Sequence, residues 1–139
     1  MKREVALAVL ERDEAWLLQL RDDLESILYP GHWGLFGGHL DPGETPSEAV
    51  HRELIEELNW SPAVPLEPWF TNHSGLRIAH VFRGALTVPV GQLTLLEGQD
   101  LKLTTKSELR RGNIWSERRH ELRPIAPGLD SVIDRLLRD

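Results

Sequence analysis

Acidic side chains gather on one short stretch of the chain. The segment 44–60 contains five acids but a single Lys or Arg, Arg52. On a helix with about 100° per residue, three of these acids share one face: Glu53, Glu56 and Glu57. A solvated helix face normally interleaves opposite charges four residues apart, because each like-charge pair costs roughly 0.2–0.5 kcal/mol. The pattern therefore favours a cation site over the alternative, an ordinary solvated face.

Arg52 cannot neutralise all of this charge within the helix. It lies about 100° from Glu53 around the helix axis, which predicts pairing with Glu48 or Glu56, four residues away on either side. Glu53 and Glu57 are then left to repel each other. Clustered carboxylate oxygens are the ligands that hard cations such as Mg²⁺ prefer. A bound Mg²⁺ would also supply the positive charge that an acidic protein needs to hold a polyphosphate.

The helix that carries these acids has clear boundary signals. Thr45 is a favoured N-cap, Pro46 suits the first helical position and Glu48 lies three residues after the cap. Asn59 stands where a C-terminal residue with positive φ is expected, and a Pro follows soon after it. These signals predict a helix over residues 46–58.

The apolar side chains of this helix adjoin the acidic face instead of lying opposite it. Four of them fall between about 60° and 200° from Glu53 around the helix axis: Val50, Leu54, Ile55 and Leu58. This stripe predicts that the helix packs against a core, with the acids at the rim of that core.

The rest of the chain indicates a mixture of strands and helices. Apolar runs predict a hairpin of two strands, 4–10 and 15–20, with a charged turn over 11–14. A type II turn is expected at Asp41-Pro42-Gly43, because Pro and Gly suit its two central positions. Further strands are expected over 33–36, 66–71, 76–88 and 101–104, and a closing helix over 129–137.

Length and composition narrow the class of protein. At roughly 150 residues per domain, 139 residues predict one domain over 1–139. The net charge of −6 disfavours nucleic acid as a partner, and the lack of Cys excludes a disulfide scaffold, a thiolate zinc site and a cysteine nucleophile. The longest aliphatic run, Val5 to Leu10, is far short of the ~20 residues that span a bilayer, and no secretory leader is evident. We therefore expect a cytoplasmic protein without a membrane partner.

The acidic helix and the loop before it resemble a known motif. The segment from Gly38 to Trp60 is similar to the Nudix box, G-x5-E-x7-R-E-U-x-E-E-x-G-U, in which U is an apolar residue. Every defined position agrees except one, where Asn59 replaces the final Gly. The exchange is conservative, because Asn also tolerates the left-handed conformation that ends a helix. The chain is identified on this basis as a member of the Nudix (MutT-like) hydrolase family.

The resemblance implies a fold, a reaction and a set of site residues. The fold is an α/β/α sandwich with a mixed β-sheet and a catalytic loop and helix, and the reaction is hydrolysis of a nucleoside diphosphate linked to another group. It requires Mg²⁺, with Mn²⁺ as the alternative ion. Glu56 and Glu57 are the implied metal ligands, joined by the backbone carbonyl of Gly37. Glu53 is implied as a further ligand or as the base that deprotonates water.

Other implied site residues lie in and beyond the box. Arg52 and Glu44 are expected to hold the acidic side chains in place. Glu97 matches a loop position where several triphosphate-cleaving relatives carry an extra acidic metal ligand; the alternative is an exposed loop acid. Substrate contacts are expected at Gly38, at His39 in the phosphate-side loop and at Arg21, which resembles a phosphate-binding position. The alternative for the last two is an ordinary surface side chain.

The substrate hypothesis depends on features outside the box. Residues 75–78 contain neither the Pro that resembles ADP-ribose hydrolases nor the Tyr that resembles dinucleoside polyphosphate hydrolases. Phe36, where many relatives have Pro, is similar to some enzymes that remove damaged purine triphosphates. We therefore expect a nucleoside triphosphate, with an oxidised or non-standard purine as the narrower hypothesis, cleaved to a monophosphate and pyrophosphate.

Alternative functions and assemblies are also considered. The first is hydrolysis of a nucleotide sugar or another nucleoside diphosphate derivative. The second is a Nudix module that binds nucleotides without turnover, which the four intact acids of the box disfavour. The expected partner is a small nucleotide, and a homodimer is compatible with the sequence.

Overall fold

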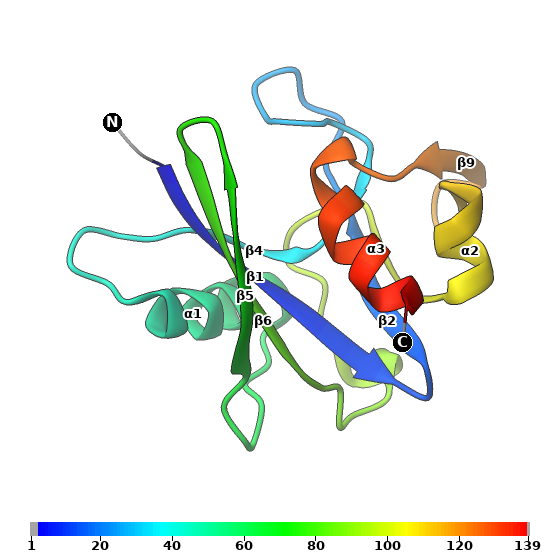
Figure 1. The fold of residues 1–139 in the computed structure, drawn as a ribbon. Helices are drawn as coiled ribbons and strands as arrows, with labels where there is room; N and C mark the ends of the chain where they lie inside the picture. The colour runs from blue at the N-terminus through cyan, green and yellow to red at the C-terminus, as the bar shows by residue number, and fades with distance from the viewer. Residues whose placement is uncertain (1–2, 139) are drawn as a thin grey trace.

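The centre of the fold is β1 (Arg3–Arg12), in a computed structural model that describes residues 3–138. This strand runs parallel to β6 (Arg77–Ala85) on one side and antiparallel to β2 (Ala15–Leu20) and β4 (Phe36–His39) on the other. The result is a seven-stranded mixed sheet (Figure 1). The parallel β1–β6 pair requires a crossover, and the acidic helix lies within it.

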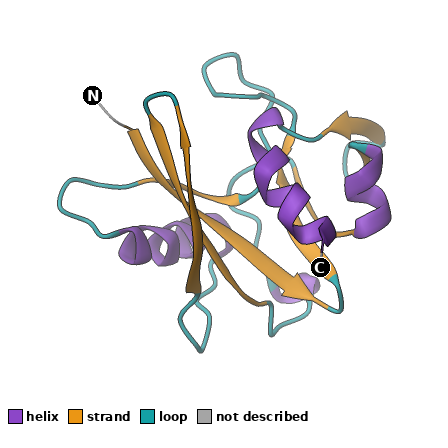
Figure 2. Cartoon of the chain, in the orientation of Figure 1, coloured by secondary structure: helices purple, strands orange, loops and turns teal. Residues whose placement is uncertain are grey.

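The other elements complete this sheet and cover it, as Figure 2 shows. β5 pairs with β6 at one edge, β7 and β3 pair with β2, and β8 and β9 form a separate two-stranded sheet. None of the helices in residues 3–138 is long and apolar enough to cross a membrane. The bounds are β3 (Trp33–Gly34), α1 (Pro46–Leu58), β5 (Glu67–Ser74), a 3₁₀ turn η1 (Val90–Gln92), β7 (Asp100–Thr105), α2 (Lys106–Arg111), β8 (Asn113–Ser116), β9 (Glu121–Pro124), a second 3₁₀ turn η2 (Pro127–Leu129) and α3 (Asp130–Arg138).

Helices cover both faces of the sheet. Side chains alternate between these faces along β1, so this strand contributes to the core on each side. Ala6, Ala8 and Leu10 point into a core that α1 covers. Val9 points into the opposite core, which α2 and α3 cover, and Figure 1 shows these helices on the other side of the sheet from α1. The α/β/α sandwich with a mixed sheet, expected from the sequence, is confirmed.

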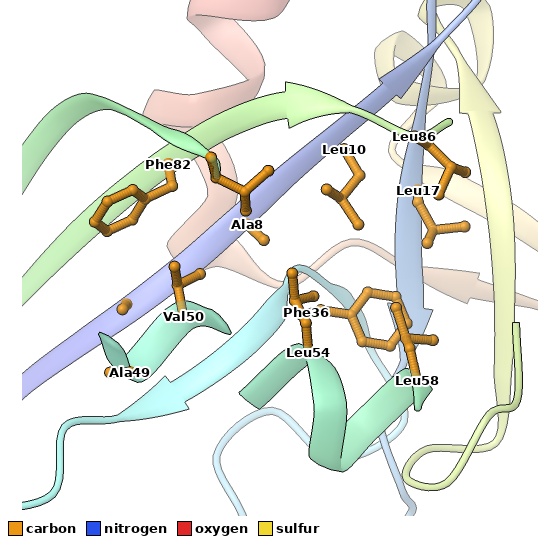
Figure 3. Packing of buried hydrophobic residues seen from close by; sticks show 12 residues of the cluster. Ala8, Leu10, Leu17, Phe36, Ala49, Val50, Leu54, Leu58, Phe82 and Leu86 are labelled. Atoms are coloured by element: carbon orange, nitrogen blue, oxygen red, sulfur yellow. The ribbon is translucent and has the colours of Figure 1, made fainter. Parts of the chain in front are cut away.

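The apolar stripe of α1 forms the middle of the first core. In Figure 3, Val50, Leu54 and Leu58 point from α1 toward Phe36 and toward side chains of the sheet, and all four are fully buried. The prediction for Ile55 is wrong, because this side chain is 50% exposed at the far end of the stripe. The buried part of the stripe is therefore narrower than the sequence indicated.

Both ends of α1 follow the sequence signals. The Thr45 hydroxyl accepts a hydrogen bond from the Glu48 N–H, and the Glu48 carboxylate accepts one from the Thr45 N–H, so the capping box is complete. Asn59 ends the helix in the left-handed conformation, with φ 51° and ψ 42°. Before the helix, Gly43 has φ 80° and the Glu44 N–H donates to the Asp41 carbonyl, as the expected type II turn requires.

Some elements differ from the sequence-based expectation. The strand expected over 33–36 is two short strands separated at Leu35, because β3 pairs with β2 whereas β4 pairs with β1. The strand expected over 76–88 ends at Ala85. Helix α2 and the β8–β9 hairpin were not expected. A signal for α2 was present, since Thr105 and Glu108 form a second capping box.

The left-handed end of α1 gives a stability prediction. Asn59→Ala should lower the free energy of unfolding by about 1 kcal/mol, because a residue with a Cβ and no local polar group pays roughly 1–2 kcal/mol in this conformation. Asn59→Gly should leave it unchanged or raise it. Urea unfolding at fixed pH measures both, with exposed Asn113 in β8 mutated to Ala as the control, for which a change within about 0.5 kcal/mol is expected. Equal losses in the Ala and Gly variants at Asn59 would contradict the assignment.

Candidate active site

Two adjacent glycines allow the backbone of β4 to lie between β1 and α1. Gly37 has φ 135°, and a Cβ at this position would collide with the Ala6 carbonyl of β1. A Cβ at Gly38 would lie 2.6 Å from the nearer carboxylate oxygen of Glu53 on α1. Gly37 therefore requires glycine, whereas a Cβ at Gly38 would displace the end of the Glu53 side chain; the acids of α1 come directly against the β4 backbone.

Glu57 is the most buried acid of this site. Its side chain is only 3% exposed, and Oε1 accepts a hydrogen bond from the Gly37 N–H at 2.8 Å. Burial raises the pKa of this carboxyl to about 9; a hydrogen bond with Glu97 and the charges of Glu53 and Glu97 add to the effect, while the Gly37 N–H opposes it. The site therefore holds an acid whose charge lacks a compensating cation.

Glu53 lies beside it, against Gly38. Its side chain is 14% exposed and accepts a hydrogen bond from Arg52 at 3.1 Å. Burial raises the pKa of Glu53; Arg52 lowers it, and the charges of Glu56 and Glu97 raise it further. The Arg52 guanidinium thus offsets part of the cost of burying this carboxylate.

Arg52 connects the helix to the loop before it. Its Nε and Nη2 donate to the two oxygens of Glu44 at 2.7 and 3.0 Å, and Nη1 donates to Glu53 and Glu56. Nη2 also donates to the His39 carbonyl at 3.0 Å. The expected pairing with Glu56 is confirmed. Glu48, the alternative partner, caps the helix instead.

Glu44 has a second role in the loop. Its Oε1 accepts a hydrogen bond from the Asp41 N–H at 2.9 Å in addition to the bond from Arg52. These hydrogen bonds to the ionised form lower its pKa. Glu44 and Arg52 therefore join the loop to the acids of α1, and the Asp41 carboxylate also lies 3.4 Å from the guanidinium.

Glu97 joins the site from a distant part of the chain. The loop before β7 contacts the end of α1, where the Leu96 N–H donates to the Glu57 carbonyl at 2.8 Å. The Glu97 side chain is exposed, and a side-chain hydrogen bond and the charge of Glu97 both contribute to the raised pKa of Glu57. The fold therefore brings the Glu97 loop to the end of α1, beside Glu57.

Other predicted site residues lie outside this group. The Glu56 side chain is 55% exposed and turned to Arg52, not to the Gly37–Gly38 turn as expected. The Arg21 Nε donates to the Leu28 carbonyl at 2.7 Å and so closes the loop after β2. The His39 side chain is exposed, whereas its carbonyl binds Arg52.

The donor set suits a hard divalent cation. All the groups that meet here offer oxygen, as carboxylates or as the β4 backbone, and a cation would relieve the raised pKa values of Glu53 and Glu57. Within residues 3–138, no three His, Asp or Glu side chains converge on a single point. Arg52 holds Glu53 and Glu56, while Gly37 holds Glu57.

The comparison with protein families agrees with this geometry. The NUDIX domain model matches residues 1–122. The chain belongs to the NUDIX domain family. Among curated Nudix relatives, the nucleoside triphosphatase NudI of Escherichia coli O1:K1 is 40% identical over 57 residues, which cover 41% of this chain and 40% of that protein. The chain spans less than half the length of the curated relatives it matches first.

Solved Nudix structures match almost the whole chain. A MutT structure, from a study of Aliivibrio salmonicida and Vibrio cholerae MutT, has a TM-score of 0.74 at 17% identity and covers 99% of this chain and 98% of its own. The NUDIX domain of Shewanella oneidensis NrtR, solved with ADP ribose, has a TM-score of 0.71 at 19% identity and covers 97% of this chain and 86% of its own. At these identities the likeness shows that the fold is shared.

Burial of Glu57 gives a pH-dependent stability prediction for the protein in EDTA. The folded-state pKa of about 9 lies above the ordinary 4.5, so the folded state binds this proton more tightly than the unfolded state. The stabilisation is complete below about pH 4.5 and is lost as the pH rises through about 9. Glu57→Gln keeps an oxygen for the Gly37 N–H and carries no charge, so it should be more stable than the native chain at about pH 8, by a margin that shrinks toward pH 5. Urea unfolding across this range measures the margin, and a constant or inverted margin would contradict the burial argument.

Proposed function

We propose that residues 1–139 act as one Nudix hydrolase domain that cleaves a nucleoside triphosphate to a monophosphate and pyrophosphate with Mg²⁺. The observation that carries this proposal is the burial of Glu53 and Glu57 against the glycine backbone of β4, with the loop of Glu97 bound to the end of the same helix. A Nudix module that binds nucleotides without turnover could lose catalytic acids, whereas Glu44, Glu53, Glu56 and Glu57 are all present here.

The metal would be held by oxygen donors from α1, from β4 and from the loop before β7. Glu57, Glu56 and Glu97 are the proposed side-chain ligands, and the Gly37 carbonyl is the proposed backbone ligand. Glu56 is held by Arg52 in the described structure, so this role requires its exposed side chain to turn from the guanidinium. Mn²⁺ is expected to replace Mg²⁺, because it accepts the same oxygen ligands.

The chain's own residues supply the rest of the chemistry. A divalent cation neutralises charge on the phosphate oxygens and makes water a better nucleophile. Glu53, partly buried and with a raised pKa, serves as a further ligand or accepts the proton of the attacking water. Attack of the water oxygen on the α- or the β-phosphorus breaks the P–O bond that joins the α- and β-phosphates. The electron pair of that bond leaves with pyrophosphate in the first case and with the nucleoside monophosphate in the second. Arg52 and Glu44 act as positioning residues, because their ion pair fixes the helix against the loop.

The triphosphate is supported by three observations. Relatives that share a 57-residue segment with this chain are named nucleoside triphosphatases. Glu97 adds an acid to the site, which suits the greater charge of three phosphates. Residues 75–78 lack the features that resemble ADP-ribose and dinucleoside polyphosphate hydrolases. The narrower hypothesis of an oxidised or non-standard purine rests on Phe36, which is fully buried in the first core.

Substrate contacts are proposed at three positions: Gly38, His39 and Arg21. Gly38 lies against Glu53, and the exposed His39 side chain follows it in the phosphate-side loop. Arg21 precedes the loop 22–32 and is the proposed phosphate contact; its Nε is engaged with the Leu28 carbonyl, so the contact would come from the rest of the guanidinium.

Loss of one acid tests the metal role. Glu56→Gln and Glu57→Gln should each lower kcat by at least about 100-fold, the scale of a lost charge-stabilising group in a transition state. Released phosphate and pyrophosphate, measured at saturating Mg²⁺, give the rate. Glu48→Gln is the matched control on α1, because Gln preserves the capping box, and it should retain native activity. Near-native turnover in either ligand variant would remove that ligand from the proposal.

A substrate panel tests the triphosphate. Purified protein with Mg²⁺ is given standard and oxidised nucleoside triphosphates, a nucleotide sugar and ADP-ribose, and the products are separated by ion exchange. A triphosphate should show the highest kcat/KM, and Glu97→Gln should lower it by roughly 10-fold or more. The triphosphate is rejected if ADP-ribose or the nucleotide sugar is turned over at least ten times better than every triphosphate. Absence of turnover with every compound, in the presence of tight binding, would instead support a binding module.

A further inference from the structure

One buried polar side chain interrupts an otherwise apolar strand. Gln19 in β2 is 4% exposed and follows Trp16, Leu17 and Leu18, which are all buried. It shares a face of the strand with Leu17, whose side chain belongs to the core beneath α1. An amide at the end of a core costs free energy unless it is hydrogen-bonded. The bond that it makes therefore indicates what this residue contributes.

Gln19 binds the backbone of the acidic loop at Glu97. Its Nε2 donates to the Glu97 carbonyl at 2.9 Å. The next residue, Gly98, has φ 98°, and a Cβ there would lie 2.8 Å from Gln19 Cγ and 2.9 Å from the Leu20 carbonyl oxygen. The loop backbone thus lies directly on the Gln19 side chain.

Backbone bonds hold the same loop on both sides of Glu97 but not at Glu97 itself. Before it, the Leu96 N–H donates to the Glu57 carbonyl at 2.8 Å. After it, the Gln99 N–H donates to the Leu20 carbonyl at 2.7 Å. The Gln19 amide supplies a bond between these two anchors, at Glu97, whose acid contributes to the raised pKa of Glu57.

We propose that Gln19 is a positioning residue that fixes the Glu97 backbone, so that the Glu97 carboxylate is presented to Glu57 for joint metal binding. The inference rests on the proposed function, in which Glu97 is a metal ligand. Gln19 itself contacts neither metal nor substrate in this account. Groups that orient metal ligands typically contribute 10–100-fold to metal affinity or activity.

The test measures Mn²⁺ binding by electron paramagnetic resonance, without substrate. Gln19→Met removes the amide donor and keeps an unbranched side chain of similar length. It should raise the Kd for Mn²⁺ by about 10-fold. The matched control is Thr104→Val, which removes another buried side-chain hydrogen bond that involves β2, from Thr104 Oγ1 in β7 to the Trp16 carbonyl. This control should leave the Kd unchanged.

A double-mutant cycle with Glu97→Gln distinguishes positioning from general support of the fold. If Gln19 acts through Glu97, Gln19→Met should cause no further change in Kd once Glu97 is replaced. An equal weakening in both backgrounds would overturn the proposal, because Gln19 would then act on the fold as a whole. Native affinity in Gln19→Met, with weakened affinity in Glu97→Gln, overturns the role of Gln19 alone. Native affinity in Glu97→Gln overturns both this inference and the metal role of Glu97.

Gly98→Ala provides a second route if Gln19→Met fails to fold. Its Cβ must push the loop away from Gln19, because the position has both a positive φ and no room. The substitution lies in the loop before β7, outside both cores. It should raise the Kd in the native background and not in the Glu97→Gln background, and an unchanged Kd in the native background would count against the proposal.

Discussion

The site depends on the way one guanidinium group is shared among carboxylates of the loop and of α1. Like charges on one helix face repel, and Arg52 is the single Lys or Arg between residues 44 and 60. Because a guanidinium presents five donors in a plane, Arg52 can bind Glu44 through two bonds while also reaching Glu53 and Glu56. The loop and the helix thereby become one unit, and a Lys could not make the same set of directed bonds.

The second constraint is the close approach of β4 to α1. Two glycines let the strand pass between β1 and the helix without side chains in the way. The Gly37 N–H then offsets part of the cost of burying Glu57, and Arg52 offsets part of the cost of burying Glu53. Neither compensation is complete, since both carboxyls keep raised pKa values. The protein thus holds its acids in an unfavourable arrangement that a bound cation would relieve, which is expected of a binding site and not of an optimised core.

The loop before β7 connects the end of α1 to the rest of the sheet. The Thr94 and Leu96 N–H groups donate to the Leu58 and Glu57 carbonyls, which lie in the last turn of the helix and lack intrahelical partners. The loop therefore caps the helix and delivers Glu97 at the same place. The same loop thus completes the acidic site and ends the helix.

The sequence by itself determined α1, because its signals are local. The capping box at Thr45, the left-handed end at Asn59 and the acidic face follow from neighbours within four residues, and the structure has each of them. The partners of Arg52 and the acidic group with Glu97 were decided by tertiary structure. Arg52 pairs with Glu44 and not with Glu48, because the type II turn brings the loop back to the helix. The Glu97 loop lies beside Glu57, because β7 pairs with β2. Contacts between residues far apart in the chain depend on strand order, which local spacing does not encode.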